Sequence, residues 1–273
     1  MVADEQEPRS FRLHAAGCET RVMAIGSGMP VLLLHGIFDD AESFVPLMHM
    51  LAGRGFSCYA IDLPGFGQAQ LDDGVPCGAE AGANWAWALI DALEQDDEVK
   101  QPWWLVGHSM GSGVAARMAS LMPERTRGLV MLAPAPHVGS SPMAPKWLPL
   151  RLFSWVFGMA SRNFWFERII RKAYGNDAVA RKEALRAALA REGLPAYVLR
   201  LVTAHCRHGV YHGWALAVFA SRDRVVRRSE RKIRALAPAV CFAAVEGAPH
   251  GFHETRAAEV FAHMAAFMAE ERL

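Results

Sequence analysis

The stretch LVGHSMGSGVAARMAS, Leu105–Ser120, runs from an apolar segment through a glycine-rich turn into a segment with helical periodicity. The apolar residues Trp103–Val106 predict a strand, and the sequence GHSMG that follows has the G-x-S-x-G form of a nucleophilic serine on a strand–turn–helix. Glycine fits two residues before and after Ser109 because side chains there would collide. We therefore predict that Ser109 stands at the carboxyl end of a strand, beside a helix N-terminus that favours negative charge. The alternative is a glycine-rich turn with an incidental serine.

Strands and helices alternate on both sides of this turn, and continuous apolar runs are typical of strands that are buried on both faces of a parallel sheet. The pattern predicts an α/β fold, a mostly parallel central sheet with helices on both faces. The other expected strands are Phe11–Ala15, Thr20–Ile25, Val31–Leu34, Ser57–Ile61, Gly128–Ala133, Trp214–Ala220 and Ala239–Val245. The other expected helices are Ala41–Arg54, Asn84–Glu94, Ser229–Ala235 and Glu254–Glu270.

Residues 134–212 interrupt this alternation with several helical stretches and no clear strand. One of these stretches is an amphipathic helix expected from about Ala178 to Arg191. We interpret them as a helical cap inserted between a first core part, 1–133, and a second, 213–273. The insertion has 12 Lys and Arg against 4 Asp and Glu, a net charge of +8 in a chain of net +1. Its aromatic residues either line a substrate site or form the core of the helices. On the first interpretation, Trp155 and Phe157 contact substrate.

The composition excludes several classes of protein. The 273 residues are 52% hydrophobic, enough for a sizeable core, and the net charge of +1 gives no case for a nucleic-acid partner. Five scattered cysteines without a C-x-x-C pair indicate reduced thiols in a cytoplasmic protein. The polar, acidic N-terminus does not resemble a secretory signal, and the longest apolar run, Trp147–Ala160, is too short to span a membrane. The sequence gives no indication of a cofactor.

A serine nucleophile needs a histidine to take its proton and a carboxylate to orient that histidine. Asp223 and His250 each follow an expected strand, which gives the order Ser109, Asp223, His250. No Asp or Glu lies between Gly128 and Arg151, so an acid on the loop after the next strand is not available. His253 is the rival base, but it falls at the start of the expected final helix. We predict a Ser109–His250–Asp223 triad.

Acyl transfer also needs two backbone N–H groups that bind the oxyanion. Met110, directly after the serine, is the first candidate, and Ile37, on the loop after Val31–Leu34, is the second. We expect His35 to bond to the backbone of that loop rather than take part in the chemistry.

Phe38 and His108 flank the oxyanion positions, and we expect both to contact substrate. Asp39 and Asp40 follow in the same loop. They predict a solvated helix start, the alternative being a pair of acids that repels anionic substrates at the mouth of the site.

The histidines near the end of the insertion suggest a metal site, because His208 and His212 have the spacing of one helix face. Gly209 weakens that helix, and no acid or second cysteine completes a ligand set beside His205, so we predict no metal. One of these histidines is instead a candidate for the mouth of the substrate site.

Five motifs together resemble the α/β-hydrolase superfamily, in its group of capped serine esterases. They are HG at 35–36, DLPGFG at 62–67, GHSMG at 107–111, SRDRVV around Asp223 and GAPHGF around His250. The resemblance covers about residues 20–268 and implies the fold, the triad and the oxyanion hole but no particular substrate. One departure is the segment before Asp223, which lacks the proline that often opens that strand, so its register is open by one or two residues.

The resemblance implies hydrolysis of a carboxylic ester with an apolar acyl or alcohol part through an acyl-enzyme. Hydrolysis of a carbon–carbon bond, a thioester or a lactone by the same triad is the alternative, and a ligand-binding protein without activity is a further one. Ser109 argues against the members that use an aspartate nucleophile. The stretches LLHGIFDDAES and DLPGFG are also similar to the pimeloyl-carrier-protein methyl esterases. A basic insertion would suit an acidic acyl carrier protein, unless it is only a solubilising face.

Overall fold

The computed structural model describes residues 7–95, 101–137, 148–155, 190–205 and 209–270. Eight strands form one sheet in the order β1-β2-β4-β3-β5-β6-β7-β8. The pairs β1–β2 and β2–β4 are antiparallel, and all pairs from β4–β3 onward are parallel, which confirms the predicted mostly parallel sheet. The strands are β1 Arg9–Ala15, β2 Cys18–Ile25, β3 Met29–Leu34, β4 Phe56–Ile61, β5 Trp103–His108, β6 Thr126–Leu132, β7 Ala215–Ala220 and β8 Cys241–Val245.

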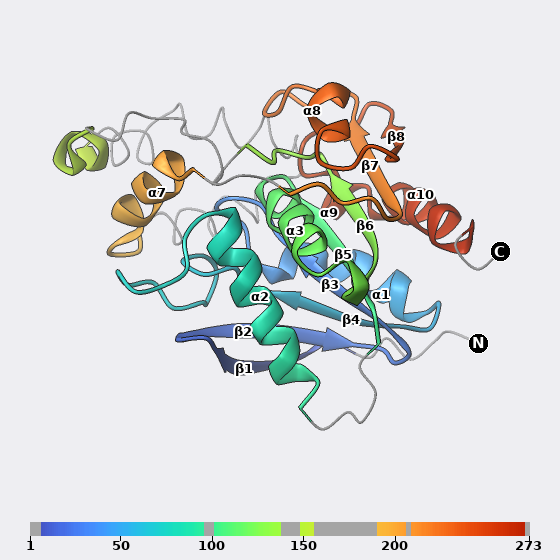
Figure 1. Ribbon diagram of the computed structural model, residues 1–273, viewed down its shortest axis with the longest axis horizontal. Helices are drawn as coiled ribbons and strands as arrows, with labels where there is room; N and C mark the ends of the chain where they lie inside the picture. Colours follow the sequence, from blue (N-terminus) through green and yellow to red (C-terminus); the bar gives the residue numbers. More distant parts are fainter. Residues whose placement is uncertain (1–6, 96–100, 138–147, 156–189, 206–208, 271–273) are drawn as a thin grey trace.

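Helices cover both faces of the sheet, as predicted (Figure 1). Because side chains alternate along a strand, Leu32 and Leu34 of β3 join the apolar cluster under α2 and α3, whereas Val31 and Leu33 join the cluster under α1 and α10. The helices are α1 Val45–Ala52, α2 Ala79–Leu93, α3 Met110–Leu121, α7 Leu194–Thr203, α8 Glu230–Arg234, α9 Phe252–Thr255 and α10 Ala257–Glu270, with 3₁₀ turns η1 Ala41–Phe44 and η2 Pro123–Arg125.

Several predicted element boundaries were wrong. The expected helix Ala41–Arg54 is the turn η1 followed by α1, which has a proline in its first turn, where the missing N–H costs nothing. The expected helix Glu254–Glu270 is divided into α9 and α10 because Arg256, with φ −132° and ψ 36°, departs from helical geometry. Helix α2 begins five residues before the expected start at Asn84. The register left open before Asp223 is settled by β7, which begins at Ala215.

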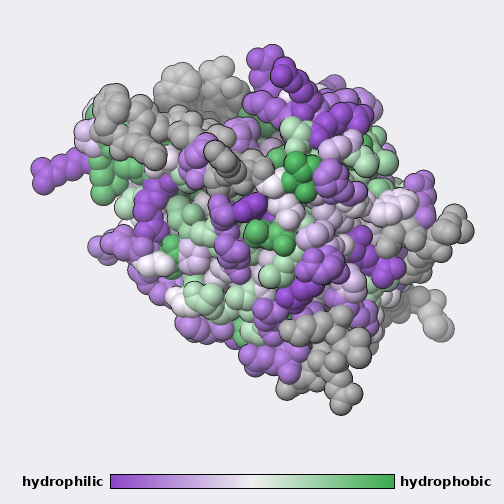
Figure 2. All heavy atoms as spheres, viewed as in Figure 1, coloured by the Kyte–Doolittle hydropathy of each residue, from purple (hydrophilic) through white to green (hydrophobic). Residues whose placement is uncertain are grey.

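The described parts of residues 134–212 contain helices and no strand. Helix α7 lies beside one end of α2 in Figure 1 and buries one face, formed by Leu194, Tyr197, Val198 and Leu201. Most of the amphipathic helix expected over 178–191 lies outside the described residues. None of the helices within the described ranges is long and apolar enough to cross a membrane. The face seen in Figure 2 mixes hydrophilic residues with small hydrophobic groups.

Candidate active site

Ser109 lies on a sharp, strained turn between β5 and α3. Its backbone has φ 51° and ψ −116°, a conformation that residues other than glycine rarely adopt. The chain around it is tightly packed: a Cβ atom on Gly107 would lie 2.3 Å from the carbonyl oxygen of Gly111, and one on Gly111 would lie 2.2 Å from that of Leu34. Only glycine fits at both places, so the GHSMG sequence forms the turn that presents Ser109 at the carboxyl end of β5.

His250 connects Ser109 to Asp223 through two hydrogen bonds. Its Nδ1 lies 2.7 Å from Oδ2 of Asp223, and its Nε2 lies 3.0 Å from Oγ of Ser109. A carboxylate only accepts, so Nδ1–H donates to Asp223, and Nε2 is left to accept from the serine hydroxyl. The side chains of His250 and Asp223 are 7% and 8% exposed, so the hydrogen bond between them is largely shielded from water.

The carboxylate of Asp223 is itself held in place by the turn after β7. The backbone N–H groups of Val225 and Val226 donate to its Oδ1 at 2.7 and 2.8 Å. Oδ2 is thereby directed at His250. The turn therefore fixes which carboxylate oxygen faces the imidazole.

The structure brings His250, not the rival His253, to Ser109. His253 is fully buried in α9, and its Nε2 lies 3.7 Å from Oδ2 of Asp39. Asp39 was expected at a solvated helix start, and this was wrong, because it is only 4% exposed. Asp40 does begin η1, where its side chain accepts from the N–H of Glu42.

The two oxyanion candidates are Met110, which directly follows Ser109, and Ile37, which follows Gly36. A Cβ atom on Gly36 would lie 3.2 Å from Cβ of Ser109. Met110 opens α3, where the first N–H groups of a helix have no partner within it. Ile37 follows β3, in a turn that the N–H of Asp39 closes by donating to the carbonyl of Gly36 at 3.3 Å. Within the described part of the chain, neither amide donates a hydrogen bond. Both N–H groups are therefore available to an oxyanion.

His35 bonds to the backbone, as expected. Its Nε2 accepts from the N–H of Leu63 at 2.9 Å, so the proton is on Nδ1, which donates to the carbonyl of Gly36 at 2.7 Å. Both ring nitrogens make hydrogen bonds. His35 therefore connects the loop between β3 and η1, residues 35–40 (the oxyanion loop), to the DLPGFG segment.

Asp62, the first residue of the DLPGFG segment, binds the backbone at Ala41 and at Gln68 and so connects the start of η1 to the end of that segment. Its carboxylate accepts from Arg21 at 2.9 and 3.3 Å and from the N–H groups of Ala41 and Gln68 at 2.8 and 2.7 Å. It is fully buried, and this set of partners compensates its lost hydration. Sequence reasoning used Asp62 only as part of a motif and missed this pairing, because Arg21 lies 41 residues away on β2.

The residues expected to contact substrate have different locations. Phe38 lies in the oxyanion loop, 6.1 Å from the ring of Phe66, which in turn lies 5.4 Å from the ring of Tyr197 on α7. Trp155 is 62% exposed, so its predicted substrate contact has no support in the described residues. Phe157 lies outside the described residues.

The expected substrate contact of His108 was wrong. Its side chain is 1% exposed, and its Nε2 lies 3.0 Å from the backbone carbonyl of His250. His108 therefore points into the protein, behind Ser109, rather than toward a ligand.

A small apolar cavity lies between α2, α3 and α7, next to the residue that follows Ser109. Its lining includes Leu63, Pro76, Met110, Val114, Tyr197 and Leu201. Among the described residues, this lining includes no charged side chain that would bind a charged ligand.

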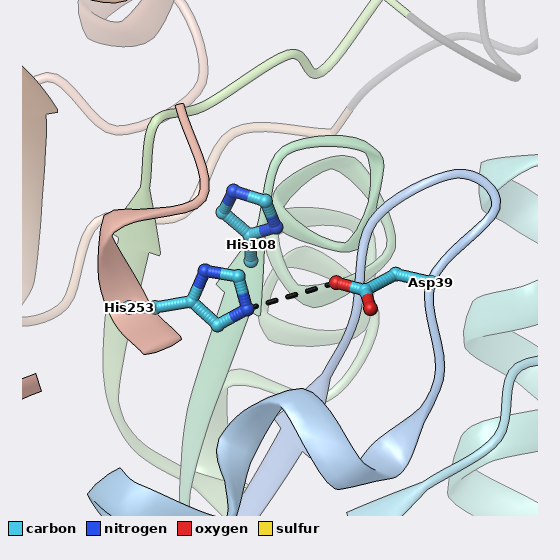
Figure 3. A group of neighbouring side chains, drawn as sticks. All are labelled: Asp39, His108 and His253. Atoms are coloured by element: carbon cyan, nitrogen blue, oxygen red, sulfur yellow. Dashed lines mark ion pairs between the residues drawn. The ribbon is translucent and has the colours of Figure 1, made fainter. Parts of the chain in front are cut away.

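The histidines considered for a metal site do not form one among the described residues. His205 and His212 are exposed, and His208 lies outside those residues. The structure instead brings together Asp39, His108 and His253, whose ligand atoms lie within 4.8 Å of one another (Figure 3). Sequence reasoning missed this cluster. The only signal was that each member lies within three residues of a predicted active-site residue.

Comparison with known proteins agrees with the fold. The family model described as serine aminopeptidase, S33 (Hydrolase_4) matches residues 29–256. The 2-hydroxy-6-oxo-2,4-heptadienoate hydrolase of Pseudomonas putida is 31% identical over 120 residues, 43% of this chain and 42% of that protein. The pimeloyl-[acyl-carrier protein] methyl ester esterase of Shewanella woodyi is 32% identical over 115 residues, 42% of this chain and 40% of that protein. The chain thus matches less than half the length of these curated relatives.

Solved structures extend the likeness to the whole chain. A thermophilic esterase from Thermogutta terrifontis aligns with a TM-score of 0.74 at 20% identity and covers 97% of this chain and 100% of its own. At this identity it shows the fold alone. The family model and both curated relatives carry the names of hydrolytic enzymes. Since the family model covers 29–256 of 273 residues, the protein belongs to the Hydrolase_4 (serine aminopeptidase, S33) family of α/β-hydrolases.

Proposed function

We propose that the protein is a serine hydrolase that cleaves a carboxylic ester with an apolar acyl or alcohol part. The observation that carries the proposal is the hydrogen-bonded series from Ser109 through His250 to Asp223. A serine hydroxyl is a poor nucleophile unless a neighbouring base takes its proton, and this arrangement supplies that base in the correct tautomer.

In the first half-reaction, Ser109 Oγ bonds to the ester carbonyl carbon while its proton passes to Nε2 of His250. The N–H groups of Ile37 and Met110 bind the oxygen that becomes negative, and the dipole of α3 favours the same charge. The imidazolium, stabilised by Asp223, then protonates the leaving alcohol. In the second half-reaction, water attacks the acyl-enzyme by the same route, and Ser109 is released with the carboxylic acid.

Two features support an apolar ester. The aromatic series Phe38, Phe66 and Tyr197 links the oxyanion loop to α7, and the cavity next to Met110 has an apolar lining. A desolvated apolar site also strengthens the interaction of the oxyanion with its donors. We assign residues 134–212 to a cap over this site, a reading supported by the buried face of α7.

Hydrolysis of a carbon–carbon bond is the second candidate, favoured by the similarity to the heptadienoate hydrolase. An acyl carrier protein ester is a further substrate class, suggested by the Shewanella relative and by the basic residues of the 134–212 insertion. Thioesters and lactones could react through the same acyl-enzyme.

The test is hydrolysis of p-nitrophenyl esters from acetate to laurate by the wild type and by Ser109→Ala, with fluorophosphonate labelling of both. We expect turnover with an optimum chain length and labelling that depends on Ser109. Labelling without ester turnover would shift the proposal to dienolic ketones and carrier-protein esters, which would be assayed next. Neither labelling nor turnover would favour a ligand-binding protein.

A further inference from the structure

Three buried polar side chains lie directly behind the proposed triad. Asp39 comes from the oxyanion loop, His108 from the last position of β5 and His253 from α9, and they are 4%, 1% and 0% exposed (Figure 3). Each belongs to the segment that carries one part of the proposed machinery, namely Ile37, Ser109 or His250. The cluster is therefore the place where these three distant segments meet inside the protein.

His108 makes the contact that reaches the proposed base. Its Nε2 lies 3.0 Å from the backbone carbonyl oxygen of His250, 142 residues away in the chain. A carbonyl only accepts, so Nε2 carries a proton and donates it. Burial lowers the pKa of His108 well below 6.5, and the neighbouring His253 and His250 lower it further. The ring is consequently neutral, with Nδ1 unprotonated.

His253 and Asp39 support His108 from the other side. The imidazole rings of His108 and His253 stack with centroids 3.9 Å apart and planes inclined by 27°, and the ring of Phe44 lies 4.9 Å from that of His253. The carboxylate of Asp39 lies 3.7 Å from Nε2 of His253. The ring of His108 is thereby held in the orientation that directs Nε2 at His250.

The stacking also argues against a metal site here. A zinc-bound imidazole nitrogen lies about 2.0–2.1 Å from the ion, with the ion close to the plane of the ring. Two nearly parallel rings that face each other at 3.9 Å do not direct lone pairs at one shared point. The cluster fits a packed support for the hydrogen bond from His108 to His250 better than a ligand set.

We propose that His108, supported by His253 and Asp39, is a positioning residue that fixes the backbone of His250 and so aligns its imidazole between Asp223 and Ser109. The inference rests on the proposed function, because it concerns the same base. Asp223 alone holds only one end of the imidazole, at Nδ1. The hydrogen bond from His108 holds the main chain from which the ring projects.

The test compares three variants by the rate of fluorophosphonate labelling, measured per folded molecule. His108→Leu removes the donor at similar size, and His108→Gln keeps an N–H at the reach of Nε2. Val130→Ala, in the apolar cluster on the same face of the sheet, lowers stability without touching the site and is the control. We expect labelling of His108→Leu to be about 10- to 100-fold slower, the scale of a misplaced catalytic group. His108→Gln should recover most of the rate, and Val130→Ala should label as wild type does.

Several outcomes would overturn the inference. They are wild-type labelling of His108→Leu, an equal loss in Val130→Ala, or a His108→Gln variant as slow as His108→Leu. If His108→Leu does not fold, His108→Asn replaces it, since its amide matches Nδ1 rather than Nε2; equal rates for Asn and Gln would count against the inference. A wild type that is not labelled at all would overturn the proposed function first, and this inference with it.

Discussion

Nδ1 of His250 lies 2.7 Å from Oδ2 of Asp223, whose other oxygen is occupied by two backbone N–H groups. The carboxylate therefore has one oxygen for the imidazole, in a fixed direction. This geometry selects the tautomer with Nε2 unprotonated, the form that accepts the proton of Ser109. The first prediction follows from it.

Asp223→Asn should lower kcat for a p-nitrophenyl ester by about 10⁴-fold, with little change in KM, because an amide N–H facing Nδ1 favours the wrong tautomer. Steady-state kinetics near neutral pH would measure both constants. Glu254→Gln, a neutralised acid four residues after His250, is the matched control and should keep wild-type kcat. If kcat of Asp223→Asn fell by less than tenfold, another acid would have to orient His250.

The strained backbone of Ser109 predicts an unusual order of stability. Glycine is normally less stabilising than alanine by about 0.5–1 kcal/mol, but a left-handed backbone in a residue with a Cβ costs about 1–3 kcal/mol. At φ 51° the second effect should win, so Ser109→Gly should have a free energy of unfolding at least that of Ser109→Ala. Urea unfolding of both inactive variants would measure it. A Gly variant that is clearly less stable than the Ala variant would contradict strain at this turn.

The lowered pKa of His108 predicts acid sensitivity of the fold. Below about pH 6.5 the unfolded chain binds a proton at this residue and the folded protein does not, so the free energy of unfolding falls as pH falls through this range. For one such group, the free energy of unfolding changes by up to about 1.4 kcal/mol per pH unit. His108→Gln should remove this part of the slope between about pH 5 and 6.5. Urea midpoints over that range would show it, with Val130→Ala, which changes packing but no titrating group, as the control that keeps the wild-type slope.

Much of the fold and the location of the proposed site could be predicted from local sequence. The buried strands are continuous apolar runs, and Ser109, Asp223 and His250 each follow one of them, at the edge where parallel strands end. Local patterns are sufficient there because strand periodicity and turn glycines act over a few residues.

The surroundings of the site could not be predicted because they depend on contacts between distant segments. His108 looked like a neighbour of the nucleophile that faces substrate, yet alternation along β5 and the approach of α9 turn it inward, against His253. Asp39 looked like part of a solvated helix start, yet the same helix covers it. Pairings across 142 or 214 residues leave no periodic signal in one sequence.

The last prediction concerns Arg191, which fastens the insertion to the DLPGFG segment. Its guanidinium donates to the carbonyls of Gly67 and Ala69, both at 2.7 Å. Arg191→Ala should lower the free energy of unfolding by about 1.5–3 kcal/mol, the range for hydrogen bonds that involve a charged group. Lysine cannot reproduce the planar fork, so Arg191→Lys should recover little of this loss.

The same contacts predict an effect on substrate binding. Phe66 lies between Phe38 and Tyr197, in the segment that Arg191 holds, so a loosened segment should raise KM for long-chain esters more than it lowers kcat. Ester kinetics across chain lengths would measure this split. Arg12→Ala is the matched control, because Arg12 also bonds the carbonyl of Gln68 but lies on the exposed edge strand β1. If Arg191→Ala changed kcat and left KM unaltered, the segment would not belong to the substrate site.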